Sequence, residues 1–236
     1  MASFNKQVKN VLVLVDDRGS GPSAGQSGIL DTVLIPSVNR QNGSVTVFDV
    51  PQNALKNRGK SAAREVSELL FGLPVCGYIS AKSDLIPWLN DYLGGISLNL
   101  TENLTNGSPA WREGAEITLK GEDCRTFLRC CRIYEAVSGL ESASMRRYFA
   151  LLLLKTREKV TKNPMQGMTL LKKLKSFTET DLSVFEILSL VTDAAKSGSN
   201  DIDMRKVPGR ISGETGKFTA SWEEVRKLFE ETGVLA

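Results

Sequence analysis

The first apolar segment of the chain ends abruptly in charged residues. Residues 11–15, VLVLV, form a continuous run of β-formers, which is typical of a strand buried on both faces of a sheet. Two further segments, TVLIPSV and SVTVFDV, flank Asn42-Gly43, a strong signal for a tight turn between antiparallel strands. The pattern predicts a buried strand followed by a hairpin over residues 32–50.

Apolar residues at helical spacing predict much of the remaining structure. Helices are expected near residues 60–71, 84–95, 145–160, 165–177, 183–196 and 221–232, and in the segment that carries Arg125, Arg129 and Arg132. Thr180-Asp181-Leu182-Ser183 is a capping sequence, and Ser221 with Glu224 fits a capping box. Because YFALLLL (148–154) is apolar almost all round, we expect its helix to pack in the middle of the protein.

Short strands are predicted between these helices. They are VCGYIS and ISLNL, with EITL as a short strand or an extended entry to the next helix, and DMRKVPGR and GKFTAS as strands of the sheet edge. Strands and helices intermix, and no low-complexity linker divides them. We therefore predict an α/β fold: a single α/β/α sandwich domain with a mixed central sheet covered by helices on both faces. It is expected to span residues 9–236, after an N-terminal tail of residues 1–8.

The composition excludes several classes of function. A net charge of +3 with 24% charged residues is typical of a soluble globular protein, without the lopsided charge of a nonspecific nucleic-acid binder, so any polyanion binding has to be local. The chain has no histidine, which excludes Ser-His-Asp and Cys-His chemistry. Any reaction must use carboxylates, lysine, arginine or a metal. The four cysteines lack paired CxxC spacing, and we expect them to be buried apolar thiols.

The candidate chemistry begins where the first strand ends. Asp16, Asp17 and Arg18 follow the apolar run directly, and in open α/β sheets ligands bind beyond the carboxyl ends of strands. If the Gly/Ser-rich segment that follows folds back, Asp31 lies beside Asp16, and two such carboxylates suit Mg²⁺. Arg18, Arg129 and Arg147, from three separate segments, are candidates to bind phosphate. The alternative is a solvated turn and ordinary surface arginines.

The order of these parts along the chain resembles the LytR-CpsA-Psr family. The series comprises an apolar strand ending in Asp-x-Arg, Asp-Thr opening a hairpin strand, a strand ending in Val-Pro, YLGGISLNL, LKGEDCRTFLR, an arginine helix entry, TDLSVFEILSL, VPGR and SWEEVRKLF. The similarity covers about residues 9–230. The ordered series, rather than any single motif, carries the resemblance.

This resemblance implies a concrete activity. Members of the family transfer anionic glycopolymers, such as wall teichoic acid or capsular polysaccharide, from an undecaprenyl pyrophosphate carrier to peptidoglycan in Gram-positive envelopes, and they use Mg²⁺. Asp16 and Asp31 would hold the metal, and Arg18, Arg129 and Arg147 would bind the pyrophosphate. The polyprenyl tail would run between sheet and helices, where YFALLLL supplies an apolar wall. Asp17 is a candidate to accept the proton of the incoming sugar hydroxyl.

The chain also departs from the family pattern at the expected site. Leu30, Gln52-Asn53, Cys131, Ser144 and Tyr148 stand where the family has Arg, Arg-Asp, Arg, Arg and Gln. Arg132 and Arg146 lie close to two of these positions and are candidate replacements. Because each lost charge-assisted contact costs about 1.5 to 3 kcal/mol, the site is expected to be degenerate. The alternative function is a non-catalytic protein that binds polyprenyl phosphate or another amphiphile.

Two other function classes find little support. A nucleotide-binding Rossmann-like protein is disfavoured because no glycine fingerprint opens into a helix after the first strand. A transcription regulator is disfavoured because no helix-turn-helix or basic recognition helix is evident, and we expect no nucleic-acid partner.

The membrane anchor typical of the family is not evident in the chain. We expect that the numbering starts after a removed anchor, which would place the protein near the membrane, on the extracellular face of a Gram-positive cell; otherwise it is cytoplasmic.

Overall fold

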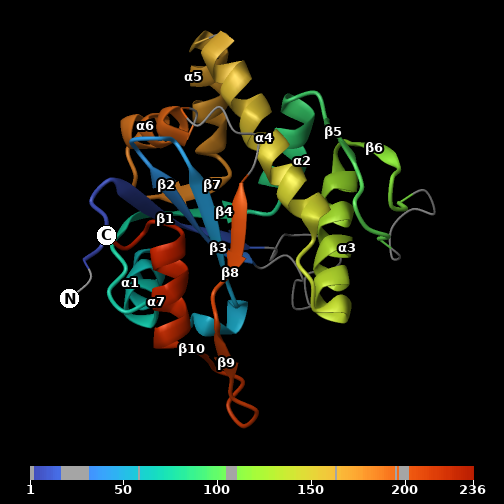
Figure 1. The fold of residues 1–236 in the computed structure, drawn as a ribbon. Coiled ribbons are helices and arrows are strands. Elements are labelled where there is room, and N and C mark those ends of the chain that lie inside the picture. Colours follow the sequence, from blue (N-terminus) through green and yellow to red (C-terminus); the bar gives the residue numbers. More distant parts are fainter. Residues whose placement is uncertain are drawn as a thin grey trace.

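The structure, a computed structural model, describes residues 3–16, 32–57, 59–104, 111–162, 164–194, 196 and 202–236. A six-stranded mixed sheet lies at its centre, with helices on both faces (Figure 1). The predicted α/β/α architecture is confirmed. The chain ends lie close together, because Phe4 forms a β-bridge with Leu235 and Asn5 N donates to Val234 O at 2.9 Å.

The central sheet has the strand order β7-β4-β1-β2-β3-β8. Its strands are β1 (Val8–Asp16), β2 (Thr32–Asn39), β3 (Val45–Val50), β4 (Val75–Lys82), β7 (Thr178–Thr180) and β8 (Asp203–Lys206). β1 pairs with β4 and β3 with β8 in parallel, whereas β1–β2, β2–β3 and β4–β7 are antiparallel. The predicted hairpin is confirmed, since Gly43 takes φ +73° in its turn and its N–H donates to Asn39 O at 2.8 Å.

The helices also follow the predicted pattern closely. They are η1 (Gln52–Ala54, a 3₁₀ turn), α1 (Gly59–Leu69), α2 (Leu85–Tyr92), α3 (Glu122–Ser138), α4 (Ala143–Lys162), α5 (Pro164–Leu174), α6 (Val184–Ala194) and α7 (Trp222–Glu231). At the start of α6 the expected capping sequence forms a capping box, because Ser183 N donates to Glu186 Oε2 at 2.8 Å while Glu186 N donates to Ser183 Oγ at 3.2 Å. Ser221 is the N-cap residue of α7, but its side chain makes no capping hydrogen bond.

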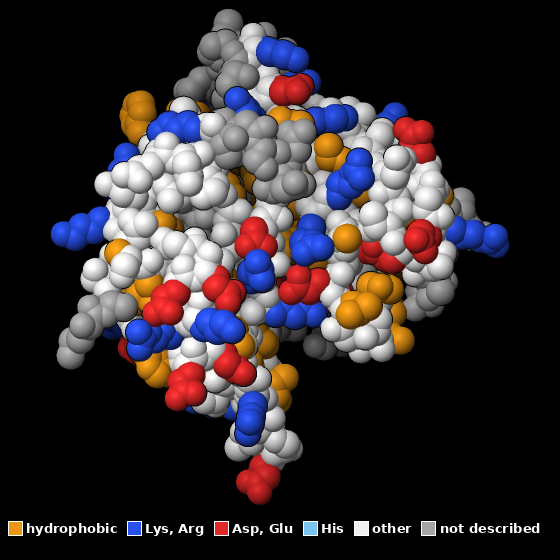
Figure 2. All heavy atoms as spheres, viewed as in Figure 1, with side chains coloured by type: hydrophobic (Ala, Val, Ile, Leu, Met, Phe, Trp, Pro, Cys, Tyr) orange, Lys and Arg blue, Asp and Glu red, His pale blue; other side chains and the backbone are white. Residues whose placement is uncertain are grey.

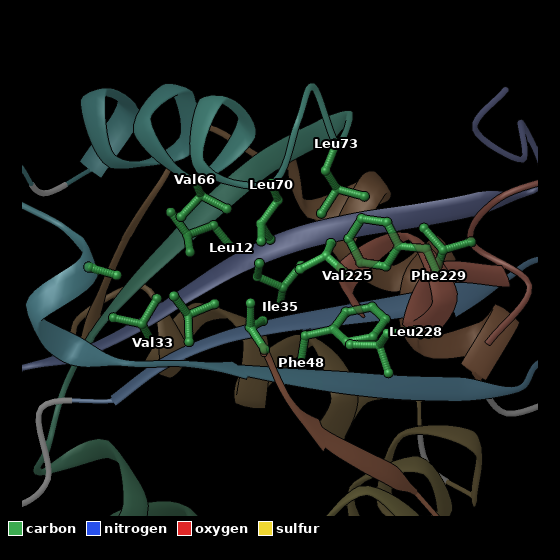
Figure 3. Packing of buried hydrophobic residues seen from close by; sticks show 14 of the residues in the cluster. Leu12, Val33, Ile35, Phe48, Val66, Leu70, Leu73, Val225, Leu228 and Phe229 are labelled. Carbon is green, nitrogen blue, oxygen red and sulfur yellow. The ribbon is translucent and has the colours of Figure 1, made fainter. Parts of the chain in front are cut away.

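One face of the sheet packs against α1 and α7 (Figure 3). Leu12, Ile35 and Phe48 from the three central strands are fully buried there. Phe48 meets Phe229 of α7 edge to face, with ring centroids 5.3 Å apart. Burying each such side chain stabilises the fold by about 1.5 to 3 kcal/mol. These contacts hold α1 and α7 against this face of the sheet.

The opposite face packs against α3, α4, α6 and a second small sheet. That sheet pairs β5 (Ile96–Asn99) with β6 (Glu116–Leu119). Met145 and Tyr148 of α4 are buried among α3 and these strands. The expectation that α4 lies in the middle of the protein holds for only one side of the helix, since Leu153 is 41% exposed.

Two further expectations are corrected. β9 (Gly209–Ile211) and β10 (Phe218–Ala220) form a separate two-stranded sheet, so of the segments expected at the sheet edge only β8 lies there. The four cysteines are free, and Cys124, Cys130 and Cys131 are buried as expected, whereas Cys76 is exposed on β4.

Candidate functional site

Three strands of the central sheet bring their ends together at the predicted site. Asp16, the last residue of β1, pairs with Lys82 at the carboxyl end of β4, and Val15 pairs with Thr32, the first residue of β2. The structure thus gives the strand position of Asp16. Asp17, Arg18 and Asp31, and the side chain of Asp16, lie outside the described part of the chain.

Helix α3 crosses this end of the sheet and is anchored at two points. Arg125 donates from Nη2 to Asp84 Oδ1 at 2.7 Å, just beyond the carboxyl end of β4. Arg132 donates to both carboxylate oxygens of Asp49, near the carboxyl end of β3. Because β1 and β2 lie between β4 and β3 in the sheet, the middle of α3 faces the ends of β1 and β2.

Arg129 occupies that middle position. It lies one turn after Arg125 and almost one turn before Arg132, on the same side of the helix. Its side chain is exposed, and it makes no ion pair or hydrogen bond with the described residues. Of the predicted phosphate-binding arginines in the described part of the chain, Arg129 is therefore the one that lies beside the end of β1 with its guanidinium uncommitted.

Arg132 has a different environment. Its guanidinium lies between Asp49 and Glu135, with Nη1 3.1 Å from Glu135 Oε2. Burial opposes the charge of Arg132, but the two carboxylates more than offset that effect and raise its pKa. The same Glu135 accepts the N–H of Ser142 at 3.0 Å, before the start of α4. Arg132 is therefore built into an ion-pair network that ties β3 to α3 and to the entry of α4.

Arg146 and Arg147 lie at the β8 side of the sheet. Arg146 pairs with Glu141 at 3.5 Å. Arg147 is exposed and makes no ion pair with the described residues; with Thr46 and Asp203 it lines a broad open hollow beside the start of β3. Since Asp49 stands toward the other end of β3, the structure does not bring Arg147 into contact with the α3 arginines.

An apolar cavity of about 310 Å³ lies between the sheet and helices α4 and α6. All of its lining side chains are apolar, and they include the following residues: Val13, Leu34, Val38 and Val47 from the strands, Phe149, Leu152 and Leu153 from α4, and Ile187, Leu190 and Val191 from α6. The cavity extends along β2 from Leu34, near the strand ends described above, to Val38, a distance of about 13 Å at 3.3 Å per residue. Such a cavity suits a chain-like apolar ligand.

Three of the departures from the family pattern occupy buried positions. Cys131, Ser144 and Tyr148 are all fully buried. Burial raises the pKa of the Cys131 thiol to about 12, and Ser144 Oγ accepts the N–H of Thr101 at 3.0 Å. A long cationic side chain does not fit at these positions in this packing. Asn53, by contrast, is exposed, and its Nδ2 donates to Gly216 O at 2.6 Å.

The described residues contain no group of three or more Cys, Asp or Glu side chains arranged to hold a metal ion. The two acids expected to hold Mg²⁺, Asp16 and Asp31, have side chains outside the described part of the chain, so this prediction stays a prediction. In the described segments no helix is both long and apolar enough to cross a bilayer.

Two features of this region were not expected from the sequence. Arg125 is positioned by Asp84 and Ser83, yet its buried Nε has no hydrogen-bond partner among the described residues. The signal for Arg125 was present in its spacing, four residues before Arg129. The contribution of α6 to the apolar cavity was also missed, although the spacing of Ile187, Leu190 and Val191 indicates one apolar helix face.

Comparison with solved structures shows which proteins share this fold. The chain is similar to Lin1025 from Listeria innocua (19% identity over 96% of this chain and 97% of that one, TM-score 0.69). It is similar to TagV from B. subtilis (18% identity, 96% and 97% coverage, TM-score 0.63) and to TagT in a complex with LI-WTA (13% identity, 96% and 89% coverage, TM-score 0.63). No protein-family model and no curated protein matches the sequence. The chain has the fold of these three proteins over almost its whole length, as its resemblance to the LytR-CpsA-Psr family predicts.

Proposed function

We propose that this protein is an Mg²⁺-dependent glycopolymer phosphotransferase of the LytR-CpsA-Psr type, which moves an anionic glycopolymer from a polyprenyl pyrophosphate carrier to peptidoglycan. The observation that carries the proposal is the apolar cavity between the sheet and helices α4 and α6. Its 310 Å³ hold about ten carbon-sized atoms, at roughly 30 Å³ each. This is enough for the first isoprene units of a lipid carrier.

The direction of the cavity supports a head group beside α3. An isoprenoid tail in the cavity emerges near Leu34 and Val13, two to three residues from the end of β1. A pyrophosphate at that point lies near Arg129, whose fork of N–H donors suits phosphate oxygens. The shared fold of TagT, seen bound to LI-WTA, supports a ligand of this kind.

The strand register supports a carboxylate pair for the metal. β1 and β2 are antiparallel, with Leu14 opposite Val33 and Val15 opposite Thr32. We propose that Asp31, the residue before Thr32 in the sequence, supplies a second carboxylate beside that of Asp16; both side chains lie outside the described part of the chain. A pair of carboxylates supplies the oxygen ligands that Mg²⁺ prefers. Bound there, the ion would neutralise charge that develops on the phosphate oxygens.

The chain's own groups have distinct roles in this proposal. Arg129 and Arg18 hold the pyrophosphate, and the cavity orients it by fixing the lipid tail. Asp17 accepts the proton of the attacking sugar hydroxyl. The burial of Cys131 and the ion pairs of Arg132 leave fewer cations for phosphate than the family pattern has, so we expect slow turnover.

The test uses a synthetic polyprenyl-pyrophosphate-linked saccharide with a peptidoglycan acceptor, with and without Mg²⁺. We expect Mg²⁺-dependent transfer that disappears in Asp16→Ala. In Arg129→Ala we expect substrate affinity to fall about 10- to 100-fold and transfer to be lost, because a charge-assisted contact contributes about 1.5 to 3 kcal/mol. The matched control is Arg226→Ala on α7, an exposed arginine paired with Glu230 far from the cavity. Loss of activity in the control, or full activity in Arg129→Ala, contradicts the assignment.

The second candidate is a protein that binds a polyprenyl phosphate or other amphiphile without turning it over. The observation that favours it is the burial of Cys131, Ser144 and Tyr148, which removes those positions from phosphate contact. Mass spectrometry of organic extracts from the purified protein separates the two. Copurified lipid together with no Mg²⁺-dependent product supports the binder, and an Mg²⁺-dependent product contradicts it.

A further inference from the structure

Positive charge is concentrated in one stretch of the chain. Residues 155–175 contain seven of the 30 Lys and Arg residues but one of the 27 Asp and Glu residues. This stretch of 21 residues therefore carries a charge of +6, whereas the whole chain carries +3. The near-neutral total conceals a strongly basic segment, which makes up the second half of α4, α5 and the start of the following turn.

This basic segment forms one end of the molecule. The end of α4 packs against α5, and the two helices project together at the top of Figure 1. Figure 2 shows Lys and Arg side chains gathered over this end, with few acidic ones among them. Lys162, Lys172, Lys173 and Lys175 are exposed. We define these four residues with Lys159 as the basic end.

Aromatic side chains lie directly beneath the basic end. Trp88 stacks between Tyr92 and Phe177, with ring centroids 5.3 and 5.4 Å away. Lys159 Nζ lies 5.1 Å from the centroid of the Tyr92 ring, and Lys173 Nζ lies 5.9 Å from that of Phe177. All three rings are partly exposed. Lysines beside a partly exposed cluster of Trp and Tyr rings are the combination found at membrane–water interfaces.

The basic end also adjoins the apolar cavity. Leu153 of α4 lines the cavity and is 41% exposed, so the cavity opens beside this helix. The basic residues of α4 begin two positions later, at Lys155. A lipid that enters the cavity beside α4 therefore passes the basic end. If the basic end binds a bilayer, the opening of the cavity lies next to the acyl chains.

We propose that the basic end is a docking surface for an anionic phospholipid bilayer. Basic side chains attract the negative surface of the bilayer, and the partly exposed rings of Trp88, Tyr92 and Phe177 settle at its head-group level. Docking delivers the cavity opening to the membrane, from which a lipid ligand is taken up. This goes beyond the transferase proposal, because docking requires neither the metal site nor turnover.

The test is co-sedimentation of the full chain with phosphatidylcholine vesicles that contain either no anionic lipid or about 30 mol% phosphatidylglycerol, which gives a strong negative surface potential. Neither kind of vesicle contains polyprenyl lipid. We expect binding to the anionic vesicles alone. The triple substitution Lys172→Glu, Lys173→Glu and Lys175→Glu should weaken binding by about 100-fold or more, since each basic residue near such a surface contributes about fivefold. Raising salt from about 0.1 to about 1 M should abolish binding, because the Debye length falls from about 10 to about 3 Å.

The matched control is the triple substitution Lys217→Glu, Arg226→Glu and Lys227→Glu, which changes the net charge equally at exposed positions near β10 and on α7. It should keep vesicle binding within about twofold of the unsubstituted protein, since a charge beyond a Debye length from the surface is screened. Equal loss in both triple variants, equal binding to neutral vesicles, or unchanged binding of the Lys172/Lys173/Lys175 variant overturns the proposal. Replacing Lys172, Lys173 and Lys175 with Gln, which adds no acid, gives an intermediate loss if docking is electrostatic. Because the vesicles contain no polyprenyl lipid, failure here is distinct from failure of the transferase proposal.

Discussion

The ion-pair network of Arg132 offers the sharpest test of how this chain uses its arginines. The perturbation is Arg132→Met, which keeps the aliphatic stem and removes the charge. Asp49 and Glu135, whose side chains are 15% and 7% exposed, are then left as like charges without their cation. Breaking a largely buried pair in this way costs about 3 to 5 kcal/mol, a large part of the roughly 5 to 15 kcal/mol that holds a domain folded.

Urea denaturation monitored by far-UV circular dichroism measures this cost. With a slope of about 3 kcal/mol per molar urea, the midpoint should fall by about 1 to 2 M. Adding Asp49→Asn and Glu135→Gln to the same variant should restore most of the loss, because the unpaired charges are gone.

A loss below about 1 kcal/mol in Arg132→Met would refute this reasoning. If stability is unchanged while pyrophosphate affinity falls, Arg132 is a ligand-binding residue, as expected for a replacement of the arginine that the family has at position 131. If stability falls and is restored by the two amides, the residue serves the fold.

Three further predictions concern pH, thiols and a close backbone contact. Lys196 and Arg40 lower the pKa of Asp193 against the opposing effect of burial, so the contribution of Asp193 to stability is present at neutral pH and lost as pH falls below about 4. In Asp193→Asn the urea midpoint should therefore depend less on pH between about pH 3 and 6. In the native protein iodoacetamide should modify Cys76 first, whereas Cys131, whose pKa is raised by burial to about 12, should react only in urea. Peptide mass mapping measures this order, and rapid labelling of Cys131 in the native protein would contradict its burial. Gly209→Ala should destabilise by about 1 to 3 kcal/mol in thermal unfolding, because its Cβ would meet the carbonyl of Thr219 across the β9–β10 pair; an unchanged Tm would show that this pair relaxes freely.

Several parts of the candidate site could be predicted because they depend on local pattern. The hairpin turn at Gly43, the capping box at Ser183 and the helix that carries Arg129 all follow from residues a few positions apart in the chain. The apolar wall supplied by YFALLLL was also predictable, and its Phe149, Leu152 and Leu153 line the cavity. Local spacing fixes which side chains share a helix face, and no tertiary information is needed for that.

The roles of individual arginines could not be predicted in the same way. Arg125, Arg129 and Arg132 share one helix face and one chemistry, yet two are held by carboxylates and the third is exposed and unpaired among the described residues. The partners Asp84 and Asp49 come from strands and turns 41 and 83 positions away. Only the strand order decides which helix position meets which strand end.

By itself the sequence determined the element types, their order and the periodicity of their apolar faces, since these depend on side-chain size and hydrophobicity at short spacing. Tertiary structure alone decided that α6 helps to enclose the cavity and that Arg132 is held by an ion-pair network. It also decided that Cys131, Ser144 and Tyr148 are buried while Cys76 is exposed. The physical reason is that burial and electrostatic pairing depend on which surfaces meet in space, and contacts between segments distant in the chain fix those surfaces only when the sheet has formed.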